Sequence, residues 1–296
     1  MVILLLIFSL NLFASDKIEI PENFKIMSFN FPTTHQNKNI FEQIAITFDC
    51  LNNNDEKRMK SAKTIVKKYL PHIIGFQETH TDDLDALFHS KTIKKYYKSY
   101  APRASTKDTD LNAIFYSHDT YMLLEKGNLF LNAEQKEGHN SWDDSHQRAC
   151  TWIYLTHVSL PIKMYIYNTH LGLTNKSIIE GSKQIADHIM TKKKNDDYVF
   201  LIGDFNASVG ELSYITKNPY NLFNIRSMTS DEHIVGPDYT YTGYDDSSKA
   251  TPDHLFSSPQ VKSLRFETIT DSSHKIRPSD HYPIMATIQI NKNTIS

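Results

Sequence analysis

The sequence predicts an α/β sandwich in which two β-sheets pack against each other. Short apolar runs rich in β-branched and aromatic residues, which are typical of buried strands, recur along the chain. Amphipathic stretches, which are typical of surface helices, alternate with these runs early in the chain, whereas the runs cluster towards its end. A fold of packed sheets with covering helices accounts for both the alternation and the clustering.

Each predicted strand is a short apolar run with polar or turn-forming residues beside it. The run at residues 162–170 alternates in character and ends in His170. The last run follows directly after an Asp-His pair. In chain order, the predicted strands cover residues 24–29, 72–77, 111–116, 150–158, 162–170, 198–202, 254–256, 264–269 and 282–290.

Two longer helices and two shorter ones are predicted between these strands. Residues 55–70 place apolar side chains on one face and Lys and Arg on the other, and Pro71 ends this helix. Residues 175–193 form the clearest amphipathic stretch. We expect Thr81 to cap a short helix through residue 88, and another short helix near Glu211. The side chains expected to face the core are Ile65, Val66, Tyr69 and Leu70 in the first helix and Ile178, Ile179, Ile185, Ile189 and Met190 in the long one.

The composition fits one large globular domain. The 296 residues are 40% hydrophobic and 22% charged, which is sufficient for a large core. Two domains would be compatible with this length, but layered α/β folds often reach roughly 250 residues as one domain. No linker-like tract rich in Pro, Gly or Ser interrupts the chain. We therefore predict a single domain over residues 16–296.

The N-terminal residues indicate export. Residues 1–15 carry no charged side chain, and the apolar run is shorter than the ~20 residues that span a bilayer. The run ends in Ala14 and Ser15, so we expect a signal peptide and a periplasmic or secreted protein. The alternative is a buried N-terminal strand or helix, because no Lys or Arg precedes the run. In an exported protein, Cys50 and Cys150, the only cysteines, could form a disulfide.

Polar side chains stand at the tips of several predicted strands. The runs FKIMSFN and IIGFQE end in an amide and a carboxylate, and VFLIGDFN ends in an Asp and an Asn. The last strand begins with the pair in SDHYPIMATI. Side chains at strand tips from distant parts of the chain indicate one shared centre. In chain order, these side chains belong to Asn30, Glu78, Asp204, Asn206, Asp280 and His281.

Metal-assisted cleavage of a phosphate ester suits this set of side chains. Such a reaction needs a hard cation at the phosphoryl oxygens, a base for water, and a means to handle charge on the leaving group. Magnesium takes oxygen ligands, often one or two carboxylates, and Glu78 and Asp280 could supply them with Asn30 nearby. We therefore expect Mg²⁺ as cofactor, with Mn²⁺ as the alternative.

The remaining polar tips suit proton transfer and phosphate binding. Asp204 could orient or deprotonate water, and Asn206, two residues on along an extended segment, would point to the same face. His281 could donate to a phosphoryl oxygen with its ring held by another carboxylate. His170 could act as a second acid or phosphate donor.

Six motifs in this order carry a family resemblance. IMSFN, IIGFQET, YNTHLG, LIGDFN, PDHLFSS and SDHYPI resemble the endonuclease/exonuclease/phosphatase superfamily, which has the deoxyribonuclease-I-like fold. The resemblance covers about residues 24–290. It implies a four-layered α/β sandwich, in which helices flank two packed mixed β-sheets and the active site lies at one end of the sheets.

The resemblance also implies a role for each matching residue. Asn30, Glu78 and Asp280 match metal-site positions, and His170 matches a contact of the phosphate or leaving group. The residues that match the water-activating Asp, the phosphate-binding Asn, the partner of the last His and that His are Asp204, Asn206, Asp253 and His281.

The chain is most similar to the secreted bacterial branch of the superfamily. Arg103 and the Trp-Asp pair before Arg148 match that branch, as does the PSDH sequence near the end. Both arginines are candidate phosphate-binding residues, because a guanidinium matches phosphate in a bidentate manner. The branch usually has Glu where Asp110 stands, which leaves the role of this position open.

Each of these residues also has a structural interpretation. Asp204 and Asn206 could form an Asx turn, and Asp253 could cap a turn after Pro252. His281 could be a core histidine with satisfied hydrogen bonds. Arg148 could pair with an acid at the surface. The centre predicted from all the motifs together accounts for every one of them, which favours the functional interpretation.

The substrate class stays open. A nuclease-like phosphodiesterase leads, with a sphingomyelinase-like phospholipid phosphodiesterase or a phosphomonoesterase as alternatives, so the partner is a nucleic acid, a phospholipid or a small phosphoester. The formal net charge of −2 does not indicate binding of nucleic acid through bulk positive charge. The chain has Ile202 before its GD motif, whereas inositol polyphosphate phosphatases of the superfamily it resembles typically have Trp at that position. This difference argues against that substrate class. A binding protein that has lost the chemistry is a further alternative. We expect a monomer without a stable protein partner.

Overall fold

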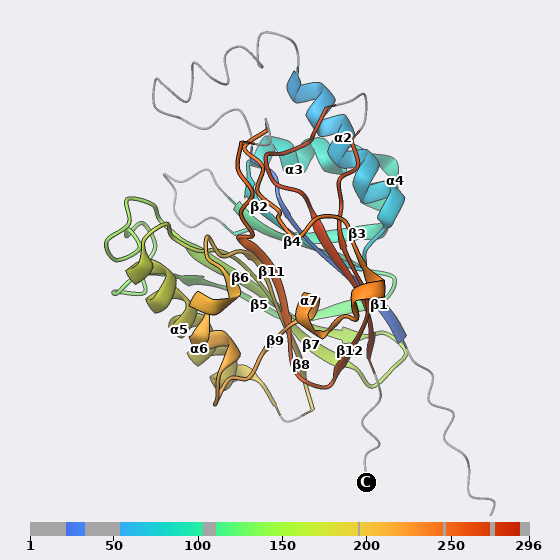
Figure 1. Cartoon of the computed structure of the whole chain (residues 1–296). Helices are drawn as coiled ribbons and strands as arrows, with labels where there is room; N and C mark the ends of the chain where they lie inside the picture. The colour runs from blue at the N-terminus through green and yellow to red at the C-terminus, as the bar shows by residue number, and fades with distance from the viewer. Residues whose placement is uncertain are drawn as a thin grey trace, which may run out of the picture.

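Figure 1 shows the computed structural model of the chain, which describes residues 22–32, 54–102, 111–194, 196–244, 247–272 and 276–290. Several sequence predictions fall outside these ranges, namely the signal peptide at residues 1–15, Cys50, Arg103 and Asp110. Cys150 is described and fully buried. Within the described ranges, no helix has the length and hydropathy needed to cross a membrane.

The first sheet has seven strands and mixes parallel with antiparallel pairs. Parallel β1 and β2 lie at its centre, and β1 also pairs antiparallel with β13. In spatial order, the sheet contains β10 (Ile234–Val235), β12 (Val261–Thr268), β13 (Ile284–Ile290), β1 (Glu22–Asn30), β2 (Ile73–Thr79), β4 (Leu111–Ser117) and β3 (Tyr97–Tyr100).

The second sheet has six strands and is also mixed. Its central strands β7 and β8 are parallel, whereas β11 pairs antiparallel with β8. In spatial order, the sheet contains β5 (Tyr121–Phe130), β6 (Ala149–His157), β7 (Lys163–His170), β8 (Tyr198–Asp204), β11 (Asp253–Ser257) and β9 (Phe223–Asn224).

Helices cover the outer faces of the two sheets, which confirms the predicted four-layered sandwich (Figure 1). One apolar cluster fills the space between the sheets, with Phe24, Ile166 and Phe200 among its members. A second apolar cluster lies between the six-stranded sheet and the helices that cover it. A third apolar cluster lies between the seven-stranded sheet and the helices on its outer face. The helices are α2 (Asn54–Tyr69), α3 (Thr81–Phe88) and α4 (Lys91–Tyr96) on one side and α5 (Asn175–Lys192) and α6 (Ser213–Thr216) on the other, and the short α7 (Ile225–Met228), η1 (Val209–Glu211) and η2 (Asp231–His233) lie in connections.

Three details of the helices differ from the sequence predictions. Leu70, expected on the core-facing side of the first helix, is exposed and lies one residue beyond α2. Thr81 is the first residue of α3 and not its cap, because His80 holds the N-cap position and its backbone N–H donates to the Asp83 carboxylate at 3.1 Å. In α5, Ile179 and Met190 are exposed. The buried face of α5 contains small residues as well as isoleucines, namely Ser177, Ile178, Gly181, Ser182, Ile185, Ala186 and Ile189.

Strand register brings the predicted polar tips to one end of the sandwich. Parallel β1 and β2 finish together, with Asn30 opposite Gln77. Parallel β7 and β8 finish with His170 opposite Asp204, and antiparallel β11 begins beside them with Asp253 opposite Asp204. Because parallel strands end and antiparallel strands begin at the same edge, side chains from distant parts of the chain meet there.

The other end of the sandwich holds both limits of the described chain. Glu22, the first residue of β1, is paired with Ile290, the last residue of β13. Phe24 and His72 stack there with ring centroids 5.8 Å apart, and the Tyr121 ring meets both edge-on. This end is therefore built from aromatic packing, in contrast to the polar tips opposite.

Candidate active site

Asp204, the last residue of β8, lies at the centre of the polar end. Its buried carboxylate accepts two hydrogen bonds, from the backbone N–H of Asn206 to Oδ1 at 2.9 Å and from Nδ2 of Asn30 to Oδ2 at 2.8 Å. The Nε2 atoms of His170 and His281 lie 3.7 and 3.8 Å from the same Oδ2. One carboxylate therefore faces two histidines and an amide that come from both sheets.

Asn30 connects Asp204 to Glu78. Its Nδ2 donates to Glu78 Oε1 at 2.9 Å as well as to Asp204. Its Oδ1 is buried and has no hydrogen-bond partner among the described residues. Amide and carboxylate oxygens are the donors that suit a hard cation such as Mg²⁺. Glu78, His170 and Asp204 also bring ligand atoms within 4.8 Å of one another, which makes this group a candidate cation site.

Glu78 reaches the site through an irregularity in β2. The β2–β4 register shifts between Phe76 and Thr79, so Gln77 and Glu78 stand opposite the single residue Asn112 and β2 carries one extra residue. Glu78 has φ 55°, in the left-handed region that non-glycine residues rarely adopt. The bulge aims the Glu78 side chain at the polar end, where its Oε1 lies 3.9 Å from His170 Nε2.

His281 lies three residues before the start of β13 and forms a hydrogen-bonded pair with Asp253. Its Nδ1 donates to Asp253 Oδ2 at 2.8 Å, and the Thr240 hydroxyl donates to the same oxygen at 2.5 Å. The ring is therefore oriented with Nε2 towards Asp204. Asp204, Asp253 and His281 form the second group of acidic and histidine side chains that gathers within the described residues.

His170 is held from the opposite side by Arg148. The guanidinium Nη1 donates to His170 Nδ1 at 2.9 Å, so Nδ1 is an acceptor and the ring proton lies on Nε2. Arg148 is buried, and its Nε has no partner among the described residues. The structure thus places Arg148 behind a histidine, where the sequence predicted a phosphate-binding residue.

The two histidines differ in charge. Burial lowers the pKa of His170 well below its usual value, and Arg148 lowers it further. For His281, burial also acts to lower the pKa, but the carboxylates of Asp253 and Asp204 outweigh burial and raise the pKa to about 10. Burial, and then the Asp253 charge, raise the pKa of Asp204 to about 6. At neutral pH the site therefore combines a neutral histidine, a cationic histidine and an ionised aspartate.

Asn206 and Asp280 lie beside this centre. Asn206 has φ 48°, so it follows a turn and not the extended segment that the sequence predicted. Its Nδ2 donates to Leu171 O at 3.0 Å, and its N–H completes the Asx turn on Asp204. Asp280 precedes His281 and accepts from the Ser279 hydroxyl at 3.2 Å, but it belongs to neither group of carboxylates and histidines within the described residues.

Gly203 allows the two strands that carry His170 and Asp204 to approach. It has φ 146°, and a Cβ atom there would lie 2.0 Å from Thr169 O in the neighbouring strand. Any larger residue would push β7 and β8 apart at their last residues. The close packing of β7 against β8 therefore requires the glycine of the GDFN motif.

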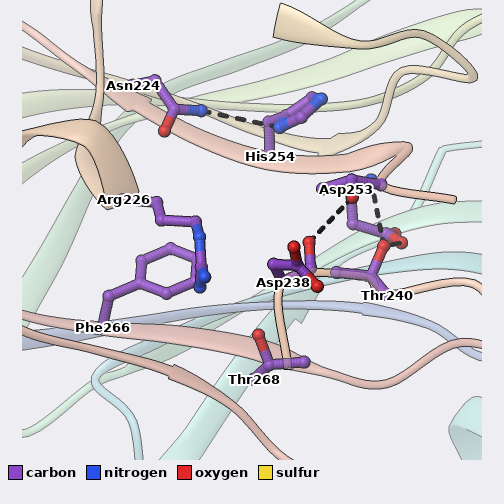
Figure 2. Close-up of a pocket in the computed structure, with 9 residues that line it drawn as sticks. Asn224, Arg226, Asp238, Thr240, Asp253, His254, Phe266 and Thr268 are labelled. Atoms are coloured by element: carbon purple, nitrogen blue, oxygen red, sulfur yellow. Dashed lines mark hydrogen bonds between the residues drawn. The ribbon is translucent and has the colours of Figure 1, made fainter. Parts of the chain in front are cut away.

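A small cavity lies beside Asp253. Figure 2 shows this cavity, which is lined by Arg226, Asp238, Thr240 and His254 among others. Its volume of about 10 Å³ is close to that of one water probe, so it cannot hold a phosphoester. This cavity is therefore not the substrate site.

Sequence reasoning missed three contributors to the site. Thr240 supports Asp253, and Gln77 and Asn168 form a buried contact beneath Glu78 and His170, with Gln77 Nε2 donating to Asn168 Oδ1 at 2.6 Å. Gln77 directly precedes Glu78 in IIGFQET, and Asn168 lies two residues before His170 in YNTHLG. The recognised motifs therefore already contained both residues. Thr240 lies in a polar segment that carried no comparable pattern.

Comparisons with known proteins add a family and a fold. The model of the endonuclease/exonuclease/phosphatase family matches residues 46–281. No curated protein matches the chain. Among solved structures, an endonuclease/exonuclease/phosphatase family protein from Bacteroides thetaiotaomicron is 19% identical with a TM-score of 0.76, covering 91% of this chain and 98% of that one.

Two further solved structures share the fold at low identity. A mannosyl-6-phosphatase from Bacteroides thetaiotaomicron is 19% identical with a TM-score of 0.75, and covers 90% of this chain and 99% of that one. D. rerio TDP2, solved in complex with a single-strand DNA product, is 17% identical with a TM-score of 0.66, and covers 90% of this chain and 98% of that one. The two proteins differ in what they bind or cleave, so this likeness concerns the fold.

Proposed function

Because the chain belongs to the endonuclease/exonuclease/phosphatase family, whose members are hydrolases acting on phosphoesters, we propose that it hydrolyses a phosphodiester with the help of a divalent cation. The observation that carries this proposal is the position of Asp204 between His170 and His281, with Asn30 joining it to Glu78. These five side chains come from different strands and connections of both sheets. The chemistry needs a base, a proton donor and cation ligands within a few ångströms of one another.

Glu78 and Asn30 are the residues that we propose to hold the cation. The Asn30 Nδ2 contacts the Glu78 carboxylate at 2.9 Å, and the same amide carries a buried oxygen with no hydrogen-bond partner among the described residues, so the two residues offer oxygens of the kind that Mg²⁺ takes. Asp280 is a third candidate, on the resemblance of its motif and not on a contact with Glu78. A bound Mg²⁺ or Mn²⁺ would neutralise charge on the phosphoryl oxygens.

Asp204 is the proposed base for the attacking water. Each of its oxygens already accepts one hydrogen bond from the protein, which fixes the carboxylate and leaves lone pairs for a water. A pKa raised to about 6 keeps the group ionised at neutral pH yet more basic than an ordinary aspartate. Both features suit removal of a proton from water as it attacks phosphorus.

The two histidines are the proposed donors to the phosphate. His281 is cationic at neutral pH, and because Asp253 occupies Nδ1 only Nε2 is directed at the substrate side. His170 is neutral and presents its Nε2 proton, because Arg148 occupies Nδ1. Together they could donate to one phosphoryl oxygen and to the leaving group, as the buildup of negative charge requires.

A substrate panel tests this proposal. The chain from Asp16 onwards would be incubated with plasmid DNA, RNA, sphingomyelin, phosphatidylinositol phosphates, a chromogenic phosphodiester and phosphomonoesters, with Mg²⁺, with Mn²⁺ and with EDTA. His281→Ala serves as the blank. Phosphodiester cleavage that needs both metal and His281 is the expected result. A folded protein that is inert on every member would overturn the proposal, and turnover of monoesters alone would replace it with phosphomonoesterase activity.

We also propose that the protein is exported, on the strength of the uncharged N-terminal residues 1–15. Expression of the whole sequence with its own N-terminus, followed by fractionation and N-terminal sequencing, tests this. A mature form that begins near Asp16 outside the cytoplasm is expected. An intact N-terminus on cytoplasmic protein would contradict export.

A further inference from the structure

Beneath the candidate active site, a buried polar contact joins the two sheets. Gln77 and Asn168 have no solvent exposure, and each comes from the centre of a different sheet. Gln77 Nε2 donates to Asn168 Oδ1 at 2.6 Å and lies 3.1 Å from the Ser28 hydroxyl. An apolar cluster lies between the same two sheets and includes Ile26, Ile166 and Ile202. Polar groups buried in such surroundings cost free energy unless they are hydrogen-bonded, so the position of this contact needs a specific explanation.

Asn168 reaches across the sandwich to the place where β2 departs from regular pairing. Its Nδ2 donates to the carbonyl oxygens of Phe76 and Ala113 at 2.9 and 3.0 Å. These two residues form the last regular pair of the β2–β4 ladder before the register shifts. A side chain from the second sheet therefore occupies the carbonyls at the start of the bulge.

The bulge is what directs Glu78 to the site. Glu78 adopts its left-handed φ of 55° directly after Gln77, whose side chain is anchored to Asn168. Such a conformation is costly and persists only where surrounding contacts determine it. Asn168 and His170 are two residues apart on one strand, so their side chains emerge on the same face of β7. One contact thus links the strand that carries Glu78 to the strand that carries His170.

We propose that Gln77 and Asn168 are a positioning pair for the active site. Asn168 supports the bulge through the Phe76 and Ala113 carbonyls, and Gln77 fixes the residue next to Glu78. Together they set the separation of 3.9 Å between Glu78 Oε1 and His170 Nε2. The catalytic meaning of this pair rests on the proposed function, but its geometric effect on Glu78 does not.

Two variants disturb the pair in different ways. Asn168→Leu keeps the approximate shape and removes every hydrogen bond of the amide. Gly75→Ala removes no polar group, but its Cβ would lie 2.6 Å from Asn168 Oδ1 and 2.7 Å from Ile202 Cδ1, so it displaces the same amide together with the Ile202 side chain. Tyr154→Phe is the matched control, because it deletes a buried hydrogen bond of the same sheet, to Asp197 at 3.0 Å, away from the bulge.

Crystal structures of the variants give the first test. In Asn168→Leu and Gly75→Ala, we expect Glu78 to leave the left-handed region or its carboxylate to move from His170 by about 1 Å, a displacement large enough to impair a site. Tyr154→Phe should leave Glu78 in place. An unchanged Glu78 conformation and separation in the two variants would overturn the inference. Gly75→Ala decides the question if Asn168→Leu fails to fold.

Binding and kinetics give the second test. Supporting residues behind metal ligands typically change metal affinity by about 10- to 100-fold, so we expect Asn168→Leu to weaken Mn²⁺ binding, measured by calorimetry, about tenfold and to lower kcat more than it raises KM. In a Glu78→Gln background, the same substitution should have no further effect on Mn²⁺ binding. Additive effects would contradict positioning through Glu78. A wild-type chain inert on every phosphoester would overturn the proposed function, whereas the Glu78 geometry would still decide this inference.

Discussion

His281 and His72 lie at opposite ends of the same sandwich, and burial acts on both, yet their pKa values move in opposite directions. At the polar end, the carboxylates around His281 outweigh burial and raise its pKa to about 10. At the aromatic end, His72 stacks on Phe24 and accepts a hydrogen bond from the Lys25 N–H at 3.0 Å. Burial, with a smaller contribution from Lys25, lowers the pKa of His72 to about 4.

Neighbouring charged groups, and not burial alone, therefore determine whether a buried histidine is protonated at neutral pH. A histidine paired with a buried carboxylate is held as a cation that can donate to an anionic substrate. A histidine among rings is held neutral and contributes packing. The same sandwich therefore separates a reactive end from a structural end.

The largest effect is expected from Asp204→Asn, which removes the proposed base and keeps the shape of the side chain. Loss of a general base costs about 10²- to 10⁴-fold, so kcat should fall about 10³-fold. Steady-state kinetics on the substrate found in the panel measure this. His72→Asn, at the other end, should leave kcat unchanged. Equal losses in the two variants would show that the ends are not separate.

His281→Gln should have the next largest effect. The amide can still donate to a phosphoryl oxygen but carries no charge, and loss of one preorganised donor costs about 10²- to 10³-fold. We expect kcat to fall about 10²-fold and the unfolding midpoint to fall as well, because the buried Asp253 carboxylate loses its cationic partner. A variant with full activity would remove His281 from the reaction.

Gly203→Ala should damage the polar end through packing. The added Cβ would lie 2.0 Å from Thr169 O and, at φ 146°, the backbone would also be strained. We expect a loss of about 3 kcal/mol in the free energy of unfolding together with reduced kcat. Gly210→Ala is the matched control, since its Cβ would meet only Ser208 Oγ at 3.9 Å. Similar stability of the two alanine variants in urea would contradict this account.

The smallest effect concerns the pH dependence that His72 contributes at the aromatic end. Its folded pKa of about 4 lies below its unfolded value of 6.5, so the unfolded chain binds a proton more readily. Stability from this group is therefore present above pH 6.5 and is lost as pH falls towards 4. His72→Asn can accept from Lys25 N–H without titrating, so it should retain about 2 kcal/mol that the wild type loses over this window. Parallel pH profiles of the unfolding free energy would contradict the assignment.

The polar residues at the ends of the central strands could be predicted from the sequence, because the local pattern of apolar residues shows where each strand begins or ends. Asn30, Asp204 and His281 each adjoin a continuous apolar run, and strands of that kind end at one edge of a layered fold. Their approach to one another follows from parallel pairing. The fold class, the two sheets and their covering helices were predictable on the same grounds.

Contacts that depend on how the two sheets face each other were not predictable. The Arg148 guanidinium could have met a phosphate or an acid, and only the packed structure shows it on His170. Strand β5 was missed because it is an edge strand with a register shift and no regular alternation of buried residues. The face of α5 was partly misassigned because Gly181 and Ala186 pack on the sheet while Ile179 stays in solvent.

The pairing of Glu22 with Ile290 has a practical consequence for handling the protein. Both residues lie at the aromatic end of the sandwich, opposite the strand ends that carry Asn30 and Asp204. A purification tag, a fluorophore or a surface tether attached through either residue would therefore point the reactive end outwards. Immobilised protein should accept bulky polymers or vesicles as readily as soluble ones, which makes solid-phase screening of large phosphoesters feasible.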